Sequence, residues 1–61
     1  MRELQSLINE LEQRRNAITD ALVAGAAKDI AEYRFMCGEI RGLSYAYTNL
    51  NDLVRKIEDD E

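Results

Sequence analysis

The apolar residues in the first third of the chain recur with the spacing of an α-helix. They lie mostly three or four residues apart, and polar residues fill most positions between them. The members of this series are Leu4, Leu7, Ile8, Leu11, Ile18, Ala21 and Leu22. Gly25 comes shortly after the series, and glycine is the usual left-handed residue just beyond a helix end. The pattern predicts a helix over residues 3–24.

The second half of the chain carries an uninterrupted hydrophobic repeat with alternating spacings of three and four. Its members are Tyr33, Met36, Ile40, Leu43, Tyr47, Leu50, Val54 and Ile57. Asp29 stands before the repeat with Glu32 three residues later, which is the spacing of a capping box at a helix start. We therefore predict a second helix over residues 30–58. The short linker then predicts a single all-α domain over residues 1–61, an antiparallel two-helix hairpin with coiled-coil-like packing.

A single continuous helix is the alternative to the hairpin, because the seven-residue phase of the apolar positions does not change across the linker. Such a helix would be about 90 Å long at 1.5 Å per residue. It would also place Gly25 and Asp29 at successive core positions, where neither residue packs well. These two residues favour the hairpin.

Two charged residues interrupt the apolar stripes, Arg15 in the first helix and Glu39 at the edge of the second. If the helix ends face each other across the linker, Arg15 stands opposite Glu39. We therefore predict an interhelical ion pair between them. The alternative is that both side chains extend into solvent.

A second set of apolar and small residues lies beside the main stripe of the second helix. It comprises Phe35, Gly38, Gly42, Ala46 and Leu53. A glycine inside a helix costs about 1 kcal/mol relative to alanine, and close approach of another helix is the usual compensation. That neighbour is either the first helix or another protein chain. Since two short helices supply little core, we predict a partner interface here and assembly into a larger helical bundle.

Composition removes most catalytic chemistry from consideration. The 61 residues include no histidine and a single cysteine, Cys37, so Ser-His, Cys-His and histidine-metal sites are excluded. The carboxylates show no metal-binding spacing, and we expect no enzyme activity, cofactor or metal. Net charge is −4, and the run Glu58-Asp-Asp-Glu61 contains four acidic residues, so we expect an acidic tail that frays over residues 58–61.

A line of basic residues runs along the outer side of the second helix, at Arg34, Arg41 and Arg55. Such a line is a candidate for contacts with nucleic-acid phosphates. The pI of 4.7 argues against nucleic acid as the main partner. The architecture is similar to that of Rop-like RNA-binding dimers, which are also built from helical hairpins of this length, although no motif is shared.

Three short segments carry a resemblance to a known group of proteins. They are Ala21-Leu-Val-Ala-Gly25, Asp29-Ile-Ala-Glu-Tyr33-Arg34 and Cys37-Gly38-Glu-Ile-Arg41-Gly42-Leu43. Together they resemble the small helical-hairpin accessory proteins of tailed bacteriophages. The resemblance implies a minor head or neck component of the virion that acts by protein–protein contact. A phage regulator that binds and inhibits a host protein is the alternative.

The expected location is the virion or the host cytoplasm. The chain has no apolar run long enough to span a membrane. Its first residues contain acidic side chains and no apolar block, so we do not expect secretion.

Overall fold

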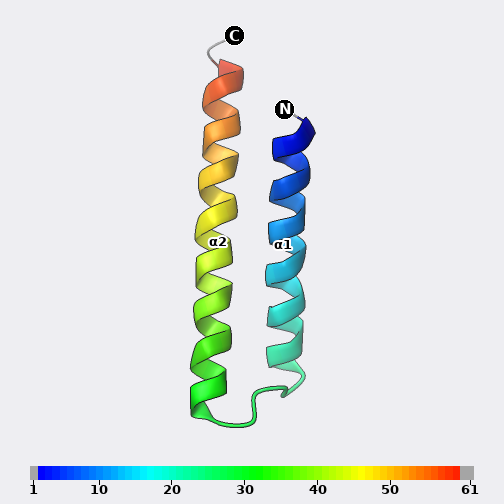
Figure 1. Ribbon diagram of the computed structural model, residues 1–61, viewed down its shortest axis with the longest axis vertical. Helices are drawn as coiled ribbons and strands as arrows, with labels where there is room; N and C mark the ends of the chain where they lie inside the picture. The colour runs from blue at the N-terminus through cyan, green and yellow to red at the C-terminus, as the bar shows by residue number, and fades with distance from the viewer. Residues whose placement is uncertain (1, 60–61) are drawn as a thin grey trace.

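The computed structural model describes residues 2–59, which form an antiparallel pair of helices packed side by side (Figure 1). The helices are α1 (Arg2–Val23) and α2 (Ile30–Asp59). The longest dimension of the molecule is 49 Å, about half that of a continuous helix of this length. The predicted hairpin is thus confirmed, and each predicted helix boundary agrees within one residue.

The end of α1 is set by Gly25, which has a φ of 86°. A left-handed residue at this place turns the chain out of the helix at no steric cost for glycine. The amide of Gly25 donates to the carbonyl of Leu22, and the amide of Ala26 donates to the carbonyl of Ala21, both at 3.0 Å. This is the hydrogen-bond pattern of a Schellman motif, and it satisfies carbonyl groups that the helix end would otherwise leave open.

The start of α2 is capped by Asp29. Its carboxylate oxygen Oδ1 accepts a hydrogen bond of 2.8 Å from the backbone amide of Glu32. This bond satisfies one of the free amides in the first turn and is worth about 1 kcal/mol. The side-chain-to-amide bond of the predicted capping box is confirmed, and α2 therefore begins at Ile30.

The core between the helices is small. Only Ile8, Ile18 and Val54 among the described residues are buried apolar side chains, with 3%, 7% and 9% of their surface exposed. The other members of the predicted seam on α2, from Met36 to Leu50 and also Ile57, are half-buried. One helix covers only one side of this seam, so the hairpin leaves much apolar surface in contact with water.

Helix α2 is longer than α1 and extends beyond it at both ends. Figure 1 shows α2 beginning beyond the last turn of α1 and extending past the start of α1 at the other end. As a result Ile30 and Tyr33, in the first turn of α2, have no helix beside them and are exposed. Tyr33 belongs to the predicted seam by its spacing, but α1 has ended before it reaches this level.

The predicted acidic tail falls partly outside the described residues. Helix α2 continues to Asp59, so Glu58 and Asp59 are helical, and fraying of this end stays a prediction. Residues 60–61 lie outside the described part of the chain.

Candidate functional site

The predicted interface residues lie on the surface of α2 beside the seam. We call the set Phe35, Gly38, Gly42, Ala46 and Leu53 the second face. Phe35 is 67% exposed and Leu53 is 46% exposed, whereas Ala46 is half-buried. Two large apolar side chains therefore stand in water at either end of a strip whose middle consists of small residues. The strip is a candidate binding surface of a kind that soluble chains usually keep covered.

The two glycines of the second face are not needed for packing against α1. A Cβ atom built at Gly38 or at Gly42 would meet no other atom within 4 Å. Both residues are exposed, and neither has a positive φ. Of the two explanations for these glycines, close approach of α1 is therefore excluded for the hairpin. The free-energy cost of these two glycines to α2 is therefore not compensated by a contact within the hairpin.

Two further residues extend the second face, and neither was singled out for it by the sequence. Tyr45 is 74% exposed and Asn49 is exposed. Together with Phe35, Gly38 and Gly42 they continue the three-four spacing of a helical seam. The three-four spacing that predicts the first seam also includes both residues on the outer side of α2.

The predicted ion pair between Arg15 and Glu39 is wrong, because each residue has another partner. The guanidinium of Arg15 donates a hydrogen bond of 2.7 Å from an Nη atom to the hydroxyl of Tyr47. Glu39 instead faces Arg14 across a distance of 3.8 Å. Tyr47 lies about two turns beyond Glu39 on α2, so the long Arg15 side chain ends at a different level of the seam from the one predicted, whereas Glu39 stays close to its predicted level.

Arg15 lies in the seam between the helices, and its partner there is the Tyr47 side chain and not a carboxylate. Its guanidinium carbon lies 5.7 Å from the centre of the Tyr47 ring, within the range of a cation–π contact. Its Nε atom is buried and has no hydrogen-bond partner. The contacts with Tyr47 offset only part of the cost of removing this cation from water. In the Arg14–Glu39 pair Arg14 is exposed and Glu39 is half-buried, and the pair contributes about 1 kcal/mol or less.

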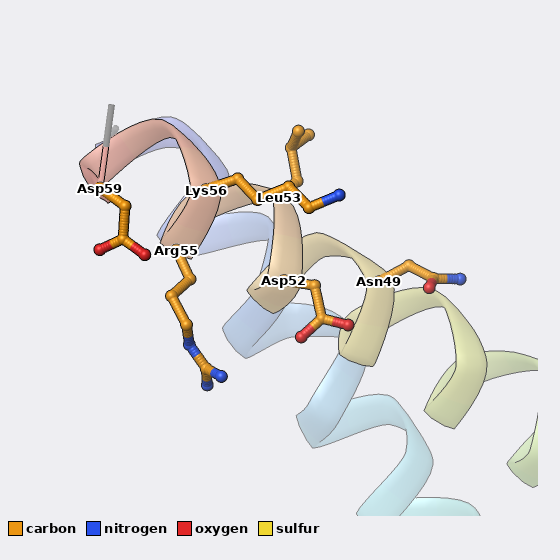
Figure 2. A pocket seen from close by; sticks show the side chains of 6 residues that line it. All are labelled: Asn49, Asp52, Leu53, Arg55, Lys56 and Asp59. Carbon is orange, nitrogen blue, oxygen red and sulfur yellow. The ribbon is translucent and has the colours of Figure 1, made fainter. Parts of the chain in front are cut away.

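The predicted basic line on α2 is interrupted by acidic residues. Arg34, Arg41 and Arg55 are all exposed. Around Arg55 the surface forms an open hollow, and Figure 2 shows that its lining side chains all come from the last turns of α2. They are Asn49, Asp52, Leu53, Arg55, Lys56 and Asp59. Two carboxylates thus stand beside the two cations, so this hollow offers no net positive charge to a phosphate.

Cys37 is half-buried at the edge of the seam, as a small core-flanking residue would be. A hydrogen bond with Cys37 raises the pKa of the Tyr33 hydroxyl above its ordinary value of 10.0. Within residues 2–59 no three histidine, cysteine, aspartate or glutamate residues come together in a way that would hold a metal ion.

Neither helix, over the residues described, combines the length and the apolarity needed to cross a bilayer. Comparison with known proteins yields no significant match, whether to a protein family model, to a curated protein or to a solved structure.

Proposed function

We propose that this protein is a non-enzymatic protein–protein interaction module whose binding surface is the second face of α2. The observation that carries the proposal is the pair of helix-interior glycines, Gly38 and Gly42, whose missing side chains face open space. A glycine in such a position weakens the helix and gains nothing for the hairpin. The backbone of a packed partner can approach closely at a glycine, which gives the residue a use.

The apolar residues around the glycines support the same function. Phe35 and Leu53 lie on either side of them and are exposed far more than core residues of this size. Aromatic and aliphatic side chains at the ends of a contact strip are typical anchors of protein interfaces. Because the hairpin buries only three apolar side chains among the described residues, covering this strip would also add to a marginal core.

The setting in which the module acts is proposed from the phage resemblance alone. It suggests a minor virion component of the head or neck, and the alternative remains a phage regulator that inhibits a host protein. Mass spectrometry of purified virions separates the two, because a structural component is present at many copies per particle and a regulator is absent from it.

The test of the binding surface compares two substitutions of equally exposed apolar residues on the same helix. Phe35 and Ile30 are 67% and 68% exposed, but Ile30 lies outside the second face. We expect Phe35→Ala to weaken self-association by about thirtyfold, which corresponds to about 2 kcal/mol for an interface anchor. Ile30→Ala is expected to leave it unchanged. Sedimentation equilibrium measures the association constants, and circular dichroism checks that both variants keep their helicity.

The opposite pattern would overturn the proposal. If Ile30→Ala weakens assembly as much as Phe35→Ala, or if neither substitution matters to an assembly that does form, the chains associate through another surface.

A further inference from the structure

The second face contains a repeat whose two copies carry opposite charge. Arg34 and Phe35 recur as Asp52 and Leu53, eighteen residues later along α2. Eighteen residues are about five full turns of an α-helix, so each member of the second pair lies directly above its counterpart in the first. All four residues are exposed. One edge of the face therefore carries a cation near one end and an anion near the other, with Arg41 on the same side of α2 between them.

From this repeat we infer that the occupant of the second face is the second face of another copy of this chain, packed antiparallel to it. This inference rests on the proposed function and names its partner. In such a pair, Phe35 of each copy lies against Leu53 of the other, and Gly42 lies opposite Ala46. Gly42 and Ala46 thus meet near the middle of the contact, where the backbones approach most closely, and Tyr45 lies beside them.

The charges complement each other only in the antiparallel arrangement. In an antiparallel pair the two-fold axis is perpendicular to the helices. The edge that carries Arg34 and Asp52 therefore lies on the same side of the pair in both copies. Arg34 of each copy then stands beside Asp52 of the other, and the contact is made twice. In a parallel pair the two-fold axis runs along the helices and moves each edge to the opposite side, so Arg34 of one copy and Asp52 of the other do not meet.

The carboxylate on the opposite edge of the face does not provide an alternative partner for Arg34. Glu39 lies on that edge, and it already faces Arg14 of its own hairpin at 3.8 Å. In the antiparallel pair, the carboxylate that lies level with Arg34 on the same edge is that of Asp52 of the other copy. The outer side of α1 is polar, with exposed residues such as Asn9, Glu12 and Gln13, and offers no comparable apolar strip.

The test is chemical cross-linking between two different single-cysteine variants. Cys37→Ser removes the native thiol, and Arg34→Cys and Asp52→Cys are prepared separately in that background, one with a tag that changes its mass. Both sites are on the rim, so the anchors Phe35 and Leu53 stay in place. A short bismaleimide is added to the mixture and the products are separated by mass. Asn16→Cys, on the exposed outer side of α1, measures cross-linking by random collision.

We expect the mixed product of Arg34→Cys with Asp52→Cys to exceed either like-with-like product by about tenfold. Like-with-like products in excess, abolished by Phe35→Ala, would overturn the antiparallel arrangement while supporting the second face as the interface. Cross-linking no stronger than that of Asn16→Cys would overturn both the arrangement and the interface.

A charge exchange provides an independent check that needs no cysteine. Arg34→Asp and Asp52→Arg should each weaken dimer formation by about tenfold, because each creates two like-charge contacts. The double variant restores opposite charges and should return to within about threefold of the original chain. A double variant weaker than both single variants would contradict the antiparallel pairing.

Discussion

Gly42→Leu is expected to lower self-association by about a hundredfold while leaving the helix content of the chain the same or higher. The two effects have separate causes. Leucine favours the helix over glycine by about 0.8 kcal/mol, and a Cβ at position 42 meets no atom of the hairpin within 4 Å. The added side chain would instead occupy the space in which the backbone of a partner helix lies. Sedimentation equilibrium and circular dichroism of the same samples measure both quantities.

Ala17→Leu is the matched control for this substitution. Ala17 is exposed on the polar outer side of α1, and the substitution adds a similar apolar bulk there. It should change neither assembly nor helicity. A Gly42→Leu protein that assembles like the original chain would refute the interface, and one that unfolds would show that the glycine serves the contact between α1 and α2.

The second large effect is expected in the core. Ile18→Ala should lower the free energy of unfolding by about 3 kcal/mol, and Ile8→Ala by a similar amount, because each removes a buried side chain and leaves a cavity. These two residues are the most deeply buried apolar side chains among the described residues. In a hairpin with so small a core, either substitution removes a large share of the total stability. Urea unfolding followed by circular dichroism measures the loss.

Val23→Ala provides the comparison, since Val23 is 83% exposed at the end of α1. It should change the free energy of unfolding by less than about 0.5 kcal/mol. Equal losses for Val23→Ala and Ile18→Ala would mean that the seam between α1 and α2 is not the core of the protein.

The helices and the turn could be predicted from the sequence because their signals are local. Gly25 ends α1 through its own backbone angle, and Asp29 starts α2 through a bond to a residue three positions away. Such signals act over a few residues and do not depend on how the helices finally pack. The hydrophobic spacing then predicts that the apolar stripe of α2 is buried by folding back against α1.

The partners of Arg15 could not be predicted in the same way. They depend on the direction in which each long side chain extends along the seam and on how the seam side chains interlock. Tyr47 lies about two turns beyond Glu39 on α2, and the guanidinium of Arg15 contacts Tyr47 although Glu39 remains near its predicted level. Adjacent residues of α1 point in different directions, so Arg14 rather than Arg15 faces Glu39.

The second face could be predicted only in part from the sequence. Its residues follow from spacing, but spacing alone does not say whether Gly38 and Gly42 admit α1 or another chain. That question depends on distances across the hairpin, and the open space around both glycines decides it. The pairing of Arg34 with Asp52 of another copy, by contrast, follows from the sequence once α2 is known to be a single helix. Residues eighteen positions apart then lie on the same side of it.

We expect this hairpin to complete its core by packing against a second copy of itself. The most direct measurement is urea unfolding of the unaltered chain at two protein concentrations that differ a hundredfold. If folding and dimer formation are coupled, the higher concentration stabilises the folded state by about 2.7 kcal/mol, and the unfolding midpoint moves to higher urea. An unfolding midpoint that is the same at both concentrations, with a monomer mass in sedimentation equilibrium, would contradict the account.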